Sequence, residues 1–207
     1  MRGQTANPEK LERQKMGRPR AFSEAEALDA AMRVFWEKGY EGTTLDDLTR
    51  AMSINRSSLY ATFGDKETLF RQVITRYSTG PMASLWEAIE QPRARAVAET
   101  LLRAVVNFLA DPSHPQGCLT LQGGMACGSA QSVRRTMIDW RKAGLSRLQK
   151  RFQRAHQEGD LASDVDPKDL ARYILVVMNG LGVQAANGAT KTEMARAVEM
   201  ALRTMPL

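Results

Sequence analysis

The sequence predicts an all-α protein with about nine helices: an N-terminal three-helix unit containing a helix-turn-helix, then a helical C-terminal domain. Two observations support this class. Apolar residues recur at helical spacing through most of the chain. Ser, Thr, Asp or Asn stands before many of these segments, where its side chain can cap the first turn of a helix. A chain of 207 residues is long enough for both parts.

The first predicted helix begins at Ser23, with Glu26 completing a capping box, and continues to about Lys38. Gly39 ends it. Its apolar face is predicted to hold the two following helices and consists of Leu28, Ala31, Met32 and Phe35.

Two short helices follow. Thr44 and Asp47 have capping-box spacing for the first, whose apolar face is formed by Leu45, Leu48 and Met52. A tight turn leads to Asn55, a good N-cap for a second helix over residues 56–63. This second helix buries Leu59 and Phe63 and can present Arg56, Ser57, Ser58 and Tyr60 outward.

Small polar and cationic groups on an exposed first turn are what a helix needs in order to enter a DNA major groove. Helix-turn-helix geometry also occurs in proteins that touch no nucleic acid. An all-α interaction protein that uses the motif as a scaffold therefore remains open from spacing alone.

Several linked motifs occur in order between Gly17 and Tyr77: GRPR, VFWEKGYEGTT and SINRSSLYATFGDKETLF. Together they resemble the TetR family of bacterial transcriptional regulators, over about the first third of the chain. Two positions depart from the family pattern. Ser53 stands where the turn usually has Gly, and Thr62 where some members carry an aromatic residue or His that touches phosphate. The DNA contacts that we expect are Arg18, Arg20, Thr44, Asn55, Arg56, Ser57, Ser58, Tyr60 and Lys66.

Asp65 caps the next predicted helix, which runs to about Tyr77. Lys66 lies in its first turn, where the helix dipole disfavours a cation. This position suggests that Lys66 faces an anion, and the resemblance implies phosphate; a solvated lysine is the alternative. Gly80-Pro81 marks the predicted domain boundary.

The predicted domains are a basic arm (1–20), a helix-turn-helix domain (21–80) and an effector-binding and dimerisation domain (81–207). The formal net charge of +6 suits a polyanionic partner. However, residues 1–20 carry six Lys or Arg against two Glu, whereas 21–80 carry seven against nine acidic residues. A positively charged surface for DNA must therefore come from the arm and from a few individual Lys or Arg side chains in the helix-turn-helix domain. The arm reaches a minor groove or phosphates, or is simply a solvated tail.

The C-terminal domain is predicted to begin with helices over 82–91 and 94–109. The glycine-rich run HPQGCLTLQGGMACGSAQS is interpreted as one loosely packed helix. A long amphipathic helix over 132–156 then turns Leu145, Leu148 and Phe152 inward. Its outward basic stripe could bind nucleic acid or membrane, or be a solvated face, and consists of Arg147, Lys150, Arg151 and Arg154.

Asp166-Pro167 is a strong helix start, and Asn187-Gly188 ends that helix. Thr190 and Glu193 cap the last one. Both carry wide apolar faces, and the resemblance implies a four-helix interface between two copies. The residues expected there are Ile174, Val177, Leu181, Met194, Val198, Ala201 and Leu202.

No catalytic constellation is evident, and we expect neither an enzyme nor a cofactor or metal. A metal-responsive or thiol-responsive sensor using Cys118 and Cys127, with His114 nearby, is an alternative, although the spacing matches no standard zinc pattern. A ligand-binding helical enzyme is disfavoured by the lack of an acid/base cluster. No apolar run approaches the roughly 20 residues of a membrane span, and the polar N-terminus suggests a cytoplasmic protein without membrane partners.

The predicted function is a ligand-responsive transcriptional regulator, most readily a repressor. As the family implies, a homodimer would bind a palindromic double-stranded operator and be released by a small effector whose identity the sequence does not give. The residues proposed to line the effector pocket are Trp86, Phe108, Cys118, Met125, Met137, Trp140 and Met178.

Overall fold

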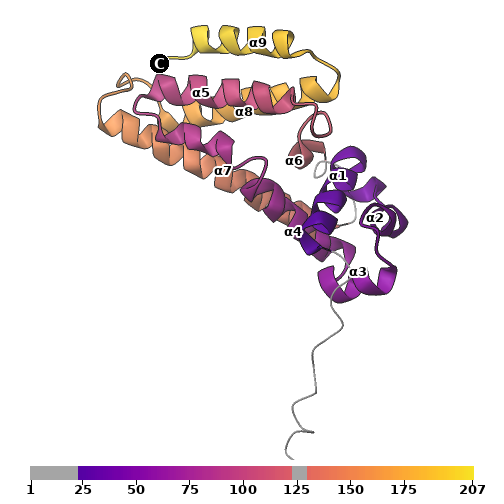
Figure 1. Cartoon of the computed structure of the whole chain (residues 1–207). Coiled ribbons are helices and arrows are strands. Elements are labelled where there is room, and N and C mark those ends of the chain that lie inside the picture. Colours follow the sequence, from indigo (N-terminus) through magenta and orange to yellow (C-terminus); the bar gives the residue numbers. More distant parts are fainter. Residues whose placement is uncertain (1–22, 123–129) are drawn as a thin grey trace, which may run out of the picture.

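The computed structural model describes residues 23–122 and 130–207, which form nine α-helices and one 3-10 helix (Figure 1). The first four helices form a compact head at one end of the molecule. They are α1 (Glu24–Gly42), α2 (Leu45–Ala51), α3 (Arg56–Phe63) and α4 (Lys66–Thr79).

The helix starts in the head follow the predicted caps. The side chain of Ser23 accepts from the backbone N–H of Glu26, and that of Asp65 accepts from Thr68. α1 continues to Gly42, but Gly39 within it has φ 68° and ψ 171°. The regular helix is thus interrupted where the sequence predicted its end, because the backbone there enters a region that glycine tolerates best.

Aromatic side chains hold α1 against α4. Phe35 meets the ring of Phe70 edge-on at 5.1 Å, and Trp36 meets Tyr77 edge-on at 4.9 Å between ring centroids. All four are buried. Leu48 and Leu59 are fully buried against the same core, so α2 and α3 are seated on a rigid base.

The remaining elements form an elongated body beside the head (Figure 1). They are η2 (Ser84–Glu90), α5 (Ala94–Leu109), α6 (Leu119–Gln122), α7 (Gln131–Gln157), α8 (Pro167–Ala186) and α9 (Lys191–Thr204). α7 packs along α8, while α5 packs against both α8 and α9. α4 leads from the head to the body and packs on α7.

Two predicted elements differ from the structure. The expected α-helix over 82–91 is instead a 3-10 helix of seven residues, η2, which ends just before Pro92. In the glycine-rich run the described part contains the four-residue α6 and the first two residues of α7. Residues 123–129 lie outside the described part, so the prediction of a helix there stays a prediction.

Arg151 corrects the predicted basic stripe on α7. Its side chain is buried, with 5% exposure, rather than facing outward. The guanidinium donates to the carbonyl oxygens of Ile89, Gln91 and Pro92 at 2.8 to 3.1 Å. These carbonyls lie at and just beyond the end of η2, where they have no partner inside a helix. Arg151 therefore ties α7 to the end of η2.

Within residues 23–122 and 130–207, no helix is both long and apolar enough to cross a bilayer.

Candidate nucleic-acid interface and ligand cavity

The start of α2 is anchored to α1 by a network of hydrogen bonds. The hydroxyl of Thr44 accepts from the Asp47 backbone N–H at 3.1 Å, and the Asp47 carboxylate accepts from that of Thr44 at 3.0 Å. Lys38 on α1 donates to the same carboxylate at 2.6 Å. The hydrogen bond from Lys38, followed by those from Thr44, holds the pKa of Asp47 well below its ordinary value. Thr44, predicted as a DNA contact, thus serves first as a helix cap.

The turn between α2 and α3 uses Ser53 in a left-handed conformation. Its φ is 54°, and it is the one non-glycine residue with positive φ in the described part of the chain. The turn therefore keeps the backbone angle that glycine usually supplies, at a cost of roughly 1–2 kcal/mol for an L-residue. Ser53 is exposed, so no neighbouring side chain resists this conformation. The departure from the family pattern changes the residue and not the geometry.

α3 carries four of the nine predicted contact residues: Arg56, Ser57, Ser58 and Tyr60. Arg56 and Ser57 are exposed, and the Tyr60 ring is 51% exposed although it is large and partly apolar. Asn55 accepts from the backbone N–H of Ser58 at 2.8 Å and so acts as the N-cap, while Ser58 itself is half-buried. The first turn of α3 thus presents polar groups to solvent.

An ion pair on this face was not foreseen from the sequence. The Arg56 guanidinium donates to the carboxylate of Asp46, in the first turn of α2, at 2.8 Å. Both side chains are more than 60% exposed. The hydrogen bond to Asp46 raises the pKa of Arg56. Asp46 and Arg56 are ten residues apart, and only the turn between the helices brings them together.

Lys66, at the start of α4, lies over the ring of Tyr40 with its ammonium 4.4 Å from the ring centroid. This contact fixes the side chain at the edge of the head, next to α3. A cation held over an aromatic face keeps its charge. Arg18 and Arg20 lie outside the described residues.

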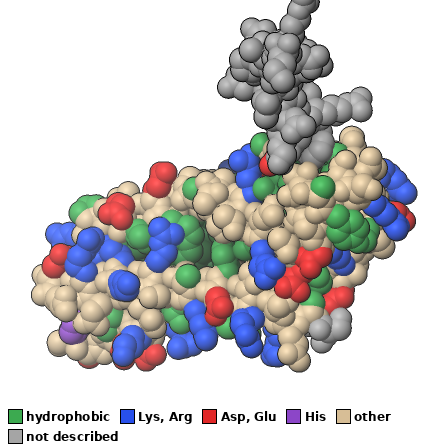
Figure 2. All heavy atoms as spheres, turned by 90° about the horizontal axis from the view of Figure 1, so that it is seen from below, with side chains coloured by type: hydrophobic (Ala, Val, Ile, Leu, Met, Phe, Trp, Pro, Cys, Tyr) green, Lys and Arg blue, Asp and Glu red, His purple; other side chains and the backbone are tan. Residues whose placement is uncertain are grey.

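On the face of the molecule drawn in Figure 2, basic and acidic side chains are interspersed. By sequence, residues 21–80 carry slightly more acidic than basic groups. A nucleic-acid contact from the head must then depend on individually placed cations.

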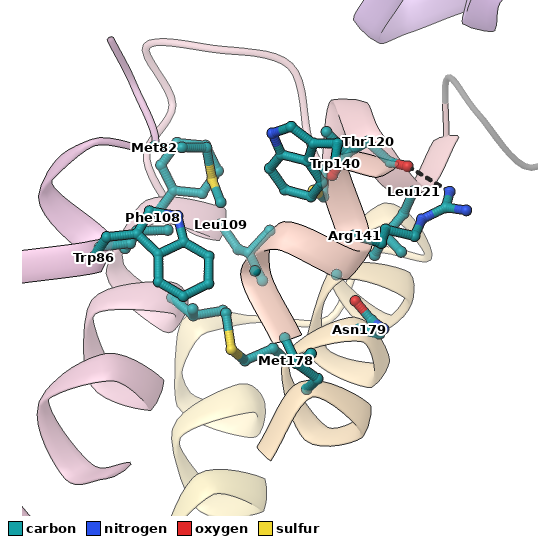
Figure 3. A pocket seen from close by; sticks show the side chains of 16 residues that line it. Met82, Trp86, Phe108, Leu109, Thr120, Leu121, Trp140, Arg141, Met178 and Asn179 are labelled. Carbon is teal, nitrogen blue, oxygen red and sulfur yellow. Dashed lines mark hydrogen bonds between the residues drawn. The ribbon is translucent and has the colours of Figure 1, made fainter. Parts of the chain in front are cut away.

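A second candidate site is a cavity in the body, bounded by η2, α5, α6, α7 and α8 (Figure 3). It encloses about 610 Å³ not filled by protein atoms, its open mouth included. The lining is mainly apolar and consists of Met82, Leu85, Trp86, Val105, Phe108, Leu109, Cys118, Thr120, Leu121, Trp140, Arg141, Gly144, Leu175, Met178, Asn179 and Gly182.

Five residues of the predicted effector pocket meet at this cavity: Trp86, Phe108, Cys118, Trp140 and Met178. Met137 does not line it, because this side chain is fully buried in the core. Met125 lies outside the described residues. The sequence reasoning missed Arg141 and Asn179, since it sought only large or soft side chains.

Two residues of the cavity wall touch the end of α4. The indole Nε1 of Trp140 donates to the hydroxyl of Ser78 at 2.6 Å, and the Cys118 sulfur lies 3.4 Å from the hydroxyl of Tyr77. Burial, followed by the neighbouring Cys118, raises the pKa of Tyr77. The helix that begins beside α3 thus ends against the cavity.

The predicted dimer-interface residues need correction. Six of them lie in the chain's own core, with at most 8% exposure, and the seventh, Val177, is partly buried. The six are Ile174, Leu181, Met194, Val198, Ala201 and Leu202. They belong to α8, which packs against α5 and α7, and to α9, which packs against α5 and α8. The large apolar side chains exposed on these helices are instead Tyr173, Val176, Val183 and Met200.

The described residues contain no group of three or more His, Cys, Asp or Glu side chains placed to hold a metal ion. The Cys118 sulfur contacts the hydroxyl of Thr120 at 3.0 Å. Cys127 lies outside the described residues, so the sensor alternative stays a prediction.

Comparison with known proteins agrees with this architecture. Residues 27–73 match the model for bacterial regulatory proteins of the tetR family, and residues 92–201 match the tetracyclin repressor-like C-terminal domain. A solved structure of the TetR family regulator CifR, complexed with 26-base-pair operator DNA, is 37% identical. It covers 91% of this chain and all of its own, with a TM-score of 0.87.

Two curated relatives from Escherichia coli K12 match along most of their length. The transcriptional repressor ComR is 29% identical over 194 residues, 92% of both chains. The transcriptional repressor BdcR is 26% identical over 189 residues, which is 89% of this chain and 90% of BdcR. One family model thus matches the head and another matches more than half of the chain. CifR, at 37% identity, aligns along the whole of its own length. This chain therefore belongs to the TetR family of transcriptional regulators.

Proposed function

We propose that the protein is a transcriptional repressor that binds operator DNA as a homodimer and releases it when a small effector enters the body cavity. The observation that carries this proposal is the outward face of α3, where Arg56, Ser57 and Tyr60 stand exposed on a helix held firmly from behind. Exposed polar side chains on the first turn of such a helix can reach base edges in the major groove.

The relatives support the repressor function and the type of DNA. ComR and BdcR are both repressors, and each aligns with about nine-tenths of this chain. CifR, which the chain resembles along its whole length, binds a double-stranded operator. Carried over to this chain, α3 would enter the groove, with Lys66 beside it on phosphate.

The exposed apolar side chains on α8 and α9 support a dimer. Tyr173, Val176 and Val183 occur at helical spacing with Gly180 between them, and so lie on one side of α8. Met200 on α9 is 60% exposed. Pairing this surface with that of a second copy would bury it and produce a four-helix contact, and a two-fold axis there would explain a palindromic operator.

Release by an effector would act through α4. Tyr77 and Ser78 at the end of this helix contact Cys118 and Trp140 of the cavity wall. A ligand that binds better when these contacts are rearranged would shift α4, and with it the spacing of the two heads. The ligand can move the equilibrium only by its difference in affinity for the two states.

Selection of binding sites from a random double-stranded DNA pool tests the function. We expect enrichment of an inverted repeat whose half-sites are centred about one helical turn, or a longer matched spacing, apart. Affinity for that site should fall steeply with salt. If no sequence is enriched and the protein ignores bulk DNA at low salt, the helix-turn-helix is a scaffold and the interaction-protein alternative holds.

A further inference from the structure

The cavity in the body has two chemically different ends (Figure 3). Trp86, Phe108 and Met82 gather on one side of the view, while Arg141 and Asn179 lie on the other, beyond Trp140. The chemistry of the lining therefore restricts which molecules could bind there.

The apolar end is aromatic, with Trp86 and Phe108 in its wall. A Cβ on Gly144 would lie 3.2 Å from the Trp86 ring, so the absence of a side chain on α7 lets that ring lie close to the helix. The thioethers of Met82 and Met178 add soft, polarisable surface around it. Such an end suits a flat ring system, since aromatic pairs gain from stacking beyond the area that they bury.

Among the described residues that line the cavity, the charged one is Arg141, at the polar end. Its Nη2 donates to the carbonyl oxygen of Thr120 at 2.8 Å, the one bond from this guanidinium in the described part of the chain. A guanidinium has five N–H groups in a planar fork, so donors remain for a ligand. Asn179 lies beside it as an exposed amide.

No Asp or Glu lines the cavity among the described residues. A cationic ligand would then meet Arg141 without a compensating carboxylate, whereas an anionic group would find a bidentate partner. A neutral apolar molecule would fill the aromatic end but leave the guanidinium to water.

We propose that the effector is a flat, apolar carboxylic acid, bound with its ring system against Trp86 and Phe108 and its carboxylate on Arg141. This inference rests on the proposed effector role of the cavity and adds the ligand class to it. Arg141 acts as the specificity-determining residue, because it separates an acid from a neutral or basic molecule of the same shape.

The test compares four probes on the full-length protein without DNA: 2-naphthoate, 2-naphthamide, 2-naphthylmethylamine and decanoate. Binding is followed by tryptophan fluorescence, because Trp86 and Trp140 lie in the cavity wall. We expect naphthoate to bind at least about tenfold more tightly than the amide, which corresponds to about 1.4 kcal/mol. The amine should be weakest, and decanoate should bind more weakly than naphthoate.

Three variants and one control test which residues give the preference for the acid over the amide. Arg141→Gln should lower naphthoate affinity about tenfold and leave that of naphthamide within about twofold, while Arg141→Lys should keep part of the preference. Arg134→Gln, at an exposed position on the same helix, is the matched control and should change neither. Gly144→Ala should weaken both probes alike, because the new methyl group displaces the Trp86 ring. Circular dichroism and thermal melting establish that each variant is folded.

Equal affinity for acid and amide in the wild-type protein, tightest binding of the amine, or equal losses of acid and amide in Arg141→Gln would each overturn the assignment. Operator binding is measured separately. If the protein binds DNA but does not prefer the acid, the ligand class is wrong and the repressor function stands. If naphthoate binds as expected but never releases operator DNA, the ligand class stands and the proposed release mechanism fails.

Discussion

At the scale of single residues, the ion pair between Asp46 and Arg56 changes how the proposed DNA-contacting face of α3 is understood. Arg56 is the long cationic side chain in the first turn of α3, and Asp46 holds its guanidinium on the same exposed face. An exposed pair of this kind contributes little to stability. Its consequence would be for binding, because DNA at this face would compete with Asp46 for the guanidinium and would bring phosphates close to a carboxylate.

Arg56→Ala should relax the preference for one base in each half-site of the operator, because an arginine fork matches guanine O6 and N7 and is worth about 1–3 kcal/mol of discrimination. Lys66→Ala should instead weaken all sequences alike and reduce the salt slope by about one phosphate contact. The measurement is a binding series over single-base operator variants at fixed salt. A uniform loss with Arg56→Ala, with every base preference intact, would make Arg56 a backbone contact.

The Asp47 network predicts a pH-dependent stability. The carboxylate has a lower pKa in the folded chain than its ordinary value of 3.8, so its stabilising effect is present above that value and is lost as the pH falls below it. Asp47→Asn should therefore cost more stability at pH 6 than at about pH 3. Urea unfolding at both pH values checks this, with Asp139→Asn on the exposed side of α7 as the control. An equal cost of Asp47→Asn at the two pH values would contradict it.

At the scale of helices, capping residues marked most ends correctly. α5 spans the predicted Ala94–Leu109, and the caps at Asn55, Asp166 and Thr190 form the expected hydrogen bonds. One of the segments that differ lies before Pro92. There the helix tightens to 3-10 geometry and leaves carbonyls for Arg151, a partner that lies about 60 residues away in the sequence.

Arg151→Met should destabilise the protein by about 2–4 kcal/mol, because the carbonyls at the end of η2 would lose a buried, charged donor. Arg151→Lys should recover only part of this loss, since one ammonium cannot match three bonds held by a planar fork. Thermal or denaturant unfolding measures both. Lys150→Gln, at the exposed neighbouring position, should change stability by less than about 0.5 kcal/mol. A cost for Arg151→Met as small as for Lys150→Gln would show that the carbonyl contacts contribute little.

At the scale of the whole molecule, α8 and α9 each have one apolar side within the body and one exposed. The inner side contains Ile174 and Leu181, and the outer side Tyr173, Val176 and Val183. Exposed apolar side chains on one side of a helix are common at interaction sites, which supports the proposed dimer contact.

Val176→Arg should convert the proposed dimer into a folded monomer, because the side chain is 61% exposed in a single chain and a charge would be buried in the contact. Leu181→Arg should behave differently and unfold the body, since Leu181 is 3% exposed. Light scattering and circular dichroism at micromolar concentration distinguish the two. Thr192→Arg, exposed at the start of α9, serves as a control that should stay dimeric. A monomeric wild-type chain would remove the dimer proposal.

The sequence by itself determined the all-α class, the helix-turn-helix and most helix ends. These features depend on local chemistry: a cap side chain reaches the first turn of its own helix, and a 3.6-residue period identifies an apolar face. Five of the seven residues predicted for the effector pocket also meet at one cavity, because large apolar side chains on inward faces converge in the body. The local signals sufficed for these predictions.

Only the tertiary structure decided what covers each face. Periodicity marked the apolar residues of α8, but it could not tell that Ile174 is buried within the chain, on a helix that packs against α5 and α7, while Val176 is exposed. In the same way, helical spacing placed Arg151 among the outward basic residues of α7, although its side chain is buried. No spacing rule pairs Asp46 with Arg56. The helical period tells in which direction around the helix axis a side chain points. What that side chain meets depends on segments brought near it by folding.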